Sequence, residues 1–290
     1  MPINLAEIVA IDTHVHIEVD DDGHLSLPQS YLDWSAKYFH SGAPRTPKID
    51  EIAAYYRERK IAAVVFSVDV ELSMGQPRIA NEFVAEGAAR NSDVLIPFAS
   101  IDPARGADGV RELERLIADH GIKGVKFHPA LQNFAPNDHL AYPMYEVLAA
   151  HGLPGLFHTG QTGIGAGMPG GGGVKLRKSE PILLDDVAAD FPDMPIIMAH
   201  PSVPWQDEAI AVANHKANVY IDLSGWAPKY FPPQLSKALN NLLRHKALFA
   251  SDYPVIDTDR WLSDFAALDL KDEVRPLILK DNAARLLKLT

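Results

Sequence analysis

The feature that most constrains this sequence is a regular alternation of two kinds of segment. Eight short runs of mainly apolar and β-branched residues are separated by longer amphipathic stretches. Apolar runs of this length are typical of strands buried on both faces, as in a parallel sheet. The runs are residues 8–12, 62–68, 94–99, 121–127, 153–157, 195–199, 218–223 and 247–251.

The amphipathic stretches predict one helix after almost every strand. They are residues 49–60, 78–89, 107–120, 141–151, 181–191, 205–215, 232–245 and 272–289. Eight strands alternating with eight helices predict an α/β fold of the (β/α)₈, or TIM-barrel, type. The 290 residues match one barrel of roughly 250 residues plus an insertion, and no repeat or linker is visible. We therefore expect a single domain over residues 1–290.

Two segments interrupt this alternation. Residues 18–48 follow the first strand, are long for a loop, and carry four aromatic side chains. Residues 163–173 follow the fifth strand and are rich in glycine, with four glycines in a row. Both lie at the carboxyl ends of strands, where barrels keep their active sites. The first segment predicts an insertion after strand 1, and the second predicts either a surface loop or a mobile lid.

Charge and cysteine content exclude several classes of function. The chain has 27 Lys and Arg against 38 Asp and Glu, a formal net charge of −11, which argues against a nucleic acid or an anionic membrane as partner. A small, anionic substrate stays compatible, since a metal ion or a few cations invert the local field. Without cysteine, a metal has only His and carboxylate ligands available.

Two further expectations concern location and assembly. The sequence has no amino-terminal secretion signal and no apolar run of the ~18 residues that span a bilayer, so we expect a cytoplasmic protein. A homodimer is the commonest assembly of such enzymes and is left open here.

Polar residues that end the predicted strands point to a metal site. His14 and His16 follow the first strand, His158 follows the fifth, and Asp252 closes the eighth. Residues i and i+2 of a strand face the same side, so His14 and His16 direct two imidazoles to one point. Strands 1 and 8 are neighbours in a closed barrel, which brings Asp252 to the same place. These ligands predict one divalent ion, with Zn²⁺ favoured and Mn²⁺ compatible.

Four other residues are candidates for chemistry or substrate binding. His200 follows the sixth strand and is either a ligand of a second metal or, as we favour, an acid or base. Lys126 and His128 share one face of the fourth strand. A lysine inside a barrel needs an anion, so Lys126 binds a substrate carboxylate, is carbamylated and bridges two metals, or reaches solvent at the rim. Trp226, after the seventh strand, is expected to line the pocket.

Several of these motifs together resemble the amidohydrolase superfamily, in particular the branch that includes aminocarboxymuconate-semialdehyde decarboxylase. The resemblance spans nearly the whole chain. It is carried by the segments Ile-Asp-Thr-His-Val-His at 11–16, Gly-Val-Lys-Phe-His-Pro at 124–129, Phe-His-Thr-Gly at 157–160, Met-Ala-His-Pro at 198–201, Ala-Ser-Asp-Tyr-Pro at 250–254 and Asp-Asn-Ala-Ala-Arg-Leu-Leu at 281–287.

The resemblance implies a distorted (β/α)₈ barrel. It implies one metal ion held by His14, His16, His158 and Asp252, a catalytic histidine at His200, and a second role for Asp252 in proton transfer. Two departures from the family pattern matter. Several aromatic-acid decarboxylases of this branch begin with Glu-x-His where this chain has His-x-His. Lys126 also lies near the place of the carbamylated lysine of binuclear members, which leaves the number of metal ions open.

Two reactions follow from these expectations. The first is hydrolysis of a small carboxylated lactone, ester or amide by a metal-activated water, with Asp252 and His200 handling the proton. The alternative is nonoxidative decarboxylation of an aromatic or muconate-type acid, in which Asp252 or His200 protonates the ring carbon. His-x-His and Lys126 favour hydrolysis slightly. A noncatalytic metal-binding barrel is disfavoured, because structural sites are closed by protein ligands whereas His200 stays free.

Overall fold

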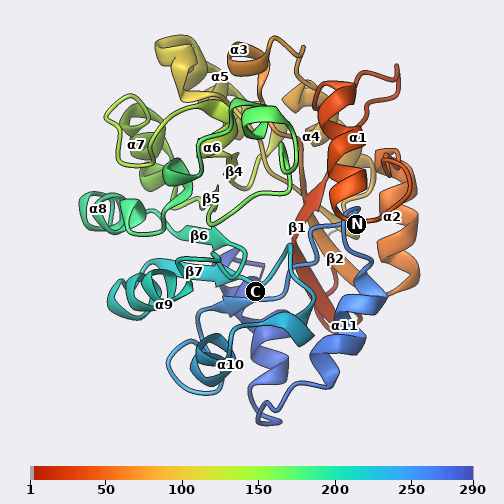
Figure 1. Ribbon diagram of the computed structural model, residues 1–290, viewed down its shortest axis with the longest axis vertical. Helices are drawn as coiled ribbons and strands as arrows, with labels where there is room; N and C mark the ends of the chain where they lie inside the picture. Colours follow the sequence, from red (N-terminus) through yellow and green to blue (C-terminus); the bar gives the residue numbers. More distant parts are fainter. Residues whose placement is uncertain (1–2, 290) are drawn as a thin grey trace.

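Eight parallel strands form the centre of the computed structural model, which describes residues 3–289 (Figure 1). Residues 1, 2 and 290 of the expected domain lie outside the described residues. The strands follow one another in space as they do in the sequence. They are β1 (Ala10–His16), β2 (Ile61–Phe66), β3 (Leu95–Pro97), β4 (Val125–Phe127), β5 (Gly155–His158), β6 (Ile196–Ala199), β7 (Val219–Asp222) and β8 (Ala247–Leu248).

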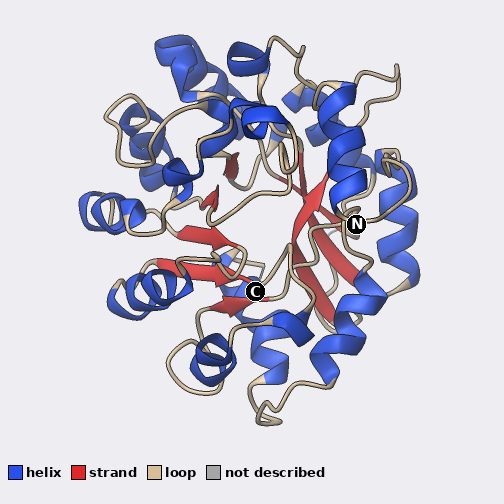
Figure 2. Ribbon diagram, viewed as in Figure 1, coloured by secondary structure: helices blue, strands red, loops and turns tan. Residues whose placement is uncertain are grey.

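Helices surround the strands on the outside, as the ribbon coloured by secondary structure shows (Figure 2). The α-helices are α1 (Gln29–Tyr38), α2 (Ile49–Glu58), α3 (Glu71–Met74), α4 (Asn81–Arg90), α5 (Gly106–His120), α6 (Pro129–Gln132), α7 (Tyr142–His151), α8 (Leu183–Asp190), α9 (Gln206–His215), α10 (Pro233–Leu239), α11 (Thr258–Ala266) and α12 (Asn282–Leu286). This alternation confirms the predicted α/β barrel.

Backbone hydrogen bonds join the two sheets, β1–β3 and β4–β8, into a barrel. At one junction the amide of Ala99 donates to the Gly124 carbonyl at 2.9 Å. At the other, the amide of Thr13 donates to Phe249 O at 3.0 Å, and the amide of Asp252 donates to His14 O at 3.1 Å. The first and last strands are therefore neighbours, as the predicted metal site requires.

Side chains alternate between the barrel interior and the layer beneath the helices, because successive residues of a strand point to opposite faces. In β2, Ala62, Val64 and Phe66 belong to the interior apolar cluster, whereas Ala63 and Val65 pack in the outer one. The interior cluster also holds residues of α12, such as Leu286. The apolar core of the barrel therefore lies at the end covered by α12, and the polar residues at the carboxyl ends of the strands lie at the opposite end.

The observed elements differ from the expected ones in several places, three of which bear on the site or on the closure of the barrel. β1 extends to His16, so His14 and His16 belong to the strand itself. α11, after β8, was not among the predicted helices. The expected helix over residues 272–289 is divided into a π-helical turn, Leu277–Asp281, and α12. The backbone amide of Phe249 donates a hydrogen bond to the carbonyl of Ile278 at 2.8 Å. This bond interrupts the regular helical hydrogen bonding at that carbonyl.

The two unusual segments of the sequence lie against each other. The insertion after β1 contains α1, and the glycine-rich residues 163–173 pack on it. The hydroxyl of Tyr31 donates to the Gly172 carbonyl at 2.7 Å. A Cβ atom at Gly163 would lie only 2.4 Å from the ring of Phe39, so this contact requires glycine. The loop and the insertion thus form one cover on the polar side of the barrel.

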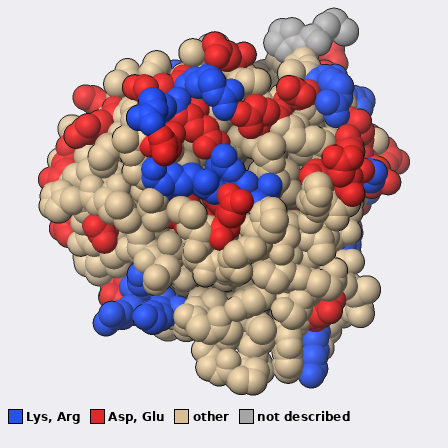
Figure 3. Space-filling model, turned by 90° about the horizontal axis from the view of Figure 1, so that it is seen from above, with Lys and Arg blue, Asp and Glu red and all other residues tan. Residues whose placement is uncertain are grey.

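The surface carries charges of both signs. On the face shown in Figure 3, Lys and Arg alternate with Asp and Glu over the upper part, and the lower part carries few charges. Among the described residues, no helix combines the length and the apolar character needed to cross a membrane.

Candidate metal centre

Three side chains from the first and last strands converge on one point. His14 Nε2, His16 Nε2 and Asp252 Oδ1 lie 3.1 Å, 3.2 Å and 3.2 Å from one another. Atoms that bind one ion at about 2.1 Å lie roughly 3.0–3.4 Å apart, so this triangle has the dimensions of a coordination face. The three converging atoms are two ring nitrogens and one carboxylate oxygen, and the amine of Lys126 lies beside them, 3.2 Å from His14 Nε2. The donor set therefore fits a divalent cation of the kind that the sequence predicts.

Carboxylates hold both imidazoles from behind. Oδ2 of Asp222, the last residue of β7, lies 2.9 Å from His14 Nδ1, and both side chains are fully buried. Oε1 of Glu18, two residues beyond His16 on the same side of the chain, lies 3.7 Å from His16 Nδ1. The hydrogen bond with Asp222 leaves Nε2 of His14 as the metal-binding atom and fixes the plane of that ring, whereas Glu18 places only a nearby negative charge at His16.

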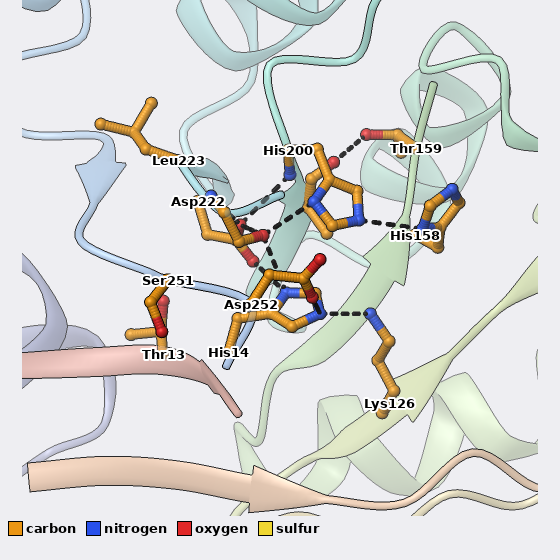
Figure 4. A network of polar contacts seen from close by, with 12 residues as sticks. Thr13, His14, Lys126, His158, Thr159, His200, Asp222, Leu223, Ser251 and Asp252 are labelled. Carbon is orange, nitrogen blue, oxygen red and sulfur yellow. Dashed lines mark hydrogen bonds and ion pairs between the residues drawn. The ribbon is translucent and has the colours of Figure 1, made fainter. Parts of the chain in front are cut away.

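His158 lies outside this triangle and pairs with His200. Nδ1 of His158 is 2.9 Å from Nε2 of His200, and the His158 ring stacks on His128 at 3.9 Å between centroids (Figure 4). Among the described residues, the groups able to hold a metal unite His14 with His16 and Asp252, and His14 with His200 and Asp222. The structure thus brings three of the four predicted ligands together and places His158 beside the predicted acid or base.

Lys126 lies between the two sets of histidines. Its Nζ is 3.2 Å from His14 Nε2, and the side chain is 1% exposed. Burial lowers the pKa of this amine to about 8, although Asp222 and Asp252 partly offset the effect. The side chain does not reach solvent at the rim, which removes one of the three expected alternatives for Lys126.

The site is buried enough to shift the pKa values of most of its titratable groups. Burial lowers the pKa of His200 and lowers those of His14 and His158 well below the ordinary value. Burial alone would raise the pKa of Asp252, but the neighbouring His14 and His16 outweigh it and hold that pKa below its usual value. Neutral imidazoles and an ionised carboxylate are the protonation states in which these side chains bind metals.

A cavity of about 710 Å³ opens onto these residues. Its lining includes all the predicted site residues except His14, which is fully buried behind the others. Trp226 and His128 line it, in agreement with their predicted position. The remaining walls mix apolar and polar side chains. The apolar ones include Tyr38, Phe39, Leu27, Val68, Leu131, Tyr230 and Ile256, the cations besides Lys126 are Arg45 and Arg260, and the carboxylates besides Asp252 are Glu18 and Asp257.

The backbone is strained at the two predicted catalytic residues. His200 has a φ of 72° and Asp252 a φ of 68°, in the left-handed region that non-glycine residues rarely adopt. Such conformations cost of order 1 kcal/mol each and persist where surrounding contacts impose them. Here the amide of His200 donates to Asp222 Oδ1 at 3.1 Å, and that of Asp252 donates to His14 O.

Sequence reasoning missed Asp222, Ser224 and Glu18. Asp222 ends an apolar strand, and Asp252 follows an apolar run of the sequence, so the rule that identified Asp252 applies to Asp222 as well. Glu18 continues the i, i+2 spacing of His14 and His16. Ser224 gave no comparable signal, because a serine after a strand is common in loops.

Comparison with known proteins relates the chain to one curated relative and to several solved structures. It is 24% identical over 274 residues to the protein fluG of Emericella nidulans; the match takes in 84% of this chain but 30% of that protein. An uncharacterised TIM-barrel protein from Bordetella bronchiseptica superimposes with a TM-score of 0.79 at 23% identity, over 96% of this chain and 98% of the other.

A second solved structure is 5-carboxyvanillate decarboxylase from Novosphingobium aromaticivorans, in complex with manganese and 4-hydroxy-3-methoxy-5-nitrobenzoic acid. It superimposes with a TM-score of 0.70 at 14% identity, over 99% of this chain and 98% of that one. At these identities, both structures show a shared fold. The amidohydrolase family model matches residues 11–289. This range contains all eight strands except Ala10, the first residue of β1. This protein is therefore a member of the amidohydrolase family.

Proposed function

We propose that this protein is a metal-dependent carboxy-lyase that removes CO₂ from a small anionic acid of the aromatic or muconate type. The observation that carries the proposal is the content of one cavity. It combines the His14–His16–Asp252 triangle, the His158–His200 pair and a buried lysine with walls that carry aromatic and aliphatic side chains as well as polar ones. The common fold with a manganese-containing carboxyvanillate decarboxylase supports this reading over hydrolysis.

One divalent ion, Zn²⁺ or Mn²⁺, would be held by His14, His16 and Asp252, with His158 as the fourth ligand that the sequence predicts. When bound, the ion would polarise the substrate oxygens that it contacts. The manganese in the carboxyvanillate enzyme supports Mn²⁺, and the nitrogen-rich donor set supports Zn²⁺.

The chain's own residues handle the proton. Decarboxylation breaks the bond between the carboxylate and the ring carbon, leaves the electron pair on that carbon, and requires a proton there. A substrate hydroxyl can supply this proton, so that a hydroxybenzoate becomes a phenolate and CO₂. His200, whose Nε2 lies 2.9 Å from His158 Nδ1, is the residue suited to take up the proton and return it. Asp252, whose pKa is lowered, serves better as an anion.

The substrate's charge and shape follow from the walls of the cavity. Lys126 is a buried cation, and Arg45 and Arg260 add two exposed ones. A flat apolar ring would contact Trp226 and Phe39, with one face away from water. A small carboxylated ring is therefore the ligand that we propose.

Hydrolysis is the second candidate, and Lys126 is the observation that favours it. Its amine lies 3.2 Å from His14 Nε2, where a carbamylated lysine would bridge two ions. In that case the substrate would be a small carboxylated lactone, ester or amide.

The two reactions are separated by their products. The purified protein, loaded with Mn²⁺ or Zn²⁺, is incubated with hydroxybenzoates and carboxyvanillate, and with lactones, in H₂¹⁸O. We expect CO₂ from an aromatic acid and no ¹⁸O in the aromatic product. His200→Gln should abolish turnover, whereas His151→Gln, an exposed histidine, should not. Products that gain ¹⁸O without CO₂ release would replace the lyase assignment with the hydrolase one.

A further inference from the structure

β1 contains an irregularity just before its second histidine. Asp12 pairs with Ala63 of β2, but Val15 pairs with Val65, so that two residues of β1 stand opposite one residue of β2. This is a β-bulge, a feature that changes the direction in which the following side chains of a strand point.

The bulge decides which way the two histidines of β1 point. Ile11, before the bulge, lies in the interior apolar cluster, whereas Val15 and Ile17, after it, lie in the outer one. Strict alternation from Ile11 would turn His14 and His16 outward, because successive side chains of a strand face opposite sides. The extra residue reverses this order. The bulge therefore lets Ile11 fill the core while both histidines face the metal centre.

The carboxyl group of Asp12 fastens this bulge to the chain that follows β8. Its Oδ1 accepts from the amide of His14 at 3.1 Å and from the amide of Ser251 at 3.0 Å. Ser251 directly precedes Asp252, the third corner of the triangle. One oxygen atom thus binds the backbone of β1 at one predicted ligand and the backbone after β8 beside another.

Further hydrogen bonds hold the backbone on both sides of Asp252. The Ser251 hydroxyl lies 2.5 Å from Asp12 Oδ2 and accepts from the amide of Tyr253 at 3.1 Å. The amide of Asp252 itself donates to His14 O at 3.1 Å. These contacts impose the left-handed φ of 68° on Asp252, a conformation that non-glycine residues rarely adopt.

Solvent does not reach the group that makes these bonds. Asp12, Ser251 and Tyr56 are fully buried. The Tyr56 hydroxyl, from α2, lies 2.7 Å from Asp12 Oδ2, so the carboxyl group is anchored to the helical layer as well. Burial of a carboxyl group is costly unless its oxygens are hydrogen-bonded, and both oxygens of Asp12 are.

We propose that Asp12 is a positioning residue of the metal centre. By joining the bulge of β1 to the backbone before Asp252, it sets His14 and Asp252 at the separation that one ion requires. It acts through two backbone amides and not as a ligand or as a charge. The inference rests on the metal ion of the proposed function, and it is the same for decarboxylation and for hydrolysis.

Two substitutions of Asp12 separate position from charge. Asp12→Asn keeps an oxygen that can accept from both amides, so its affinity for Zn²⁺ or Mn²⁺, measured by competition with a chelator, should stay close to that of the unaltered protein. Asp12→Ala removes the acceptor, and the affinity should fall about 10- to 100-fold. Tyr56→Phe removes only a contact at Oδ2 and is the matched control, with unchanged affinity expected.

The visible absorption spectrum of bound Co²⁺ reports the arrangement of the ligands, which a loss of stability alone would not alter. The spectrum should change in Asp12→Ala and be restored in Asp12→Asn. An affinity and spectrum retained in a folded Asp12→Ala protein would refute the proposal. If the alanine variant does not fold, Asp12→Asn decides: a loss of affinity as large as that expected for alanine would show that the charge of Asp12 matters and not its position.

Crystals of the metal-free proteins give a readout that does not need the ion. The bulge between Asp12 and Val15 and the distance from His14 Nε2 to Asp252 Oδ1 should be the same in Asp12→Asn as in the unaltered protein, and both should change in Asp12→Ala. A protein that binds no divalent ion would overturn the proposed function, while these crystals would still decide the part of Asp12. An unchanged distance in crystals of Asp12→Ala would overturn it.

Discussion

The Nδ1 atom of His14 lies 2.9 Å from Oδ2 of Asp222, and neither side chain is exposed to solvent. His14 belongs to β1 and Asp222 to β7, so this contact joins two strands that have β8 between them. It directs His14 Nε2 toward His16 and Asp252, and it places a negative charge behind the predicted metal. Among the residues that the sequence did not indicate, Asp222 is therefore the one whose substitution tests the metal site most directly.

Replacing Asp222 with asparagine should weaken metal binding without unfolding the protein. The amide still accepts from His14, but the charge that raises the basicity of the imidazole is lost. Affinity for Zn²⁺ or Mn²⁺, measured by competition with a chelator, should fall about 10- to 100-fold. Asp193→Asn, an exposed change just before β6 and therefore at the opposite end of the barrel from the site, is the control. An unaltered affinity would show that Asp222 supports only the backbone at His200.

Metal removal should lower the stability of the fold. An ion that binds only the native state at a concentration 100 times its Kd adds about 2.7 kcal/mol to the free energy of unfolding. Thermal unfolding with Mn²⁺ or Zn²⁺ should therefore have a higher midpoint than with a chelator. Asp252→Asn should remove most of this difference, whereas the exposed Asp272→Asn should preserve it. Equal midpoints in the unaltered protein would argue against a bound ion.

Stability should fall as the pH rises from about 4 to 7, because of Asp12. Burial raises the pKa of this carboxyl from 3.8 to about 7, despite hydrogen bonds from Ser251 and Tyr56. Below pH 3.8 it is protonated in both states. Between 3.8 and 7 the unfolded chain releases a proton that the native protein keeps, so the free energy of unfolding falls by up to roughly 4 kcal/mol.

Comparison with Asp12→Asn isolates this effect from other groups. The difference in free energy of unfolding between the variant and the unaltered protein, measured with denaturant in the presence of a chelator, should move in favour of the variant as the pH rises and level off above 7. A difference independent of pH would show that Asp12 is ionised in the native state throughout.

Opening of the glycine-rich loop should depend on Tyr31. Its hydroxyl donates to Gly172 O, so Tyr31→Phe removes one hydrogen bond between α1 and residues 163–173, worth about 1 kcal/mol. Hydrogen exchange in these residues should become roughly fivefold faster. Tyr38→Phe is the matched control, since no hydrogen bond of the Tyr38 hydroxyl is found within residues 3–289. Equal exchange in both variants would mean that aromatic packing alone holds the loop.

The barrel could be predicted because parallel strands buried on both faces leave continuous apolar runs in the sequence. Boundaries were harder where tertiary contacts decide them. Gly121 adopts a left-handed conformation that ends α5, so β4 begins at Val125 and not at residue 121. The break before α12 depends on the bond from Phe249 to Ile278 O, which no local pattern records.

The site was predictable wherever it follows from strand geometry alone. His14, His16 and Asp252 lie at one point because the barrel closes between β1 and β8. The pairing of His158 with His200 depends on how two rings turn inside the barrel, and the contact of Ser224 Oγ with His200 Nδ1, 2.8 Å long, depends on the path of the loop after β7. These features of the site therefore could not be predicted from the amino-acid sequence.

The closure between β1 and β8 also has a consequence for synthesis. Thr13 bonds to Phe249, 236 positions later, and Asp252 joins His14 at the same junction. A ribosome therefore releases seven strands before the first strand acquires its second neighbour. Until then one side of β1 is an unpaired edge, open to other chains. Release of β8 and of Asp252 just beyond it completes the barrel and the site in the same event, so nascent chains stalled before β8 should both aggregate and fail to retain metal.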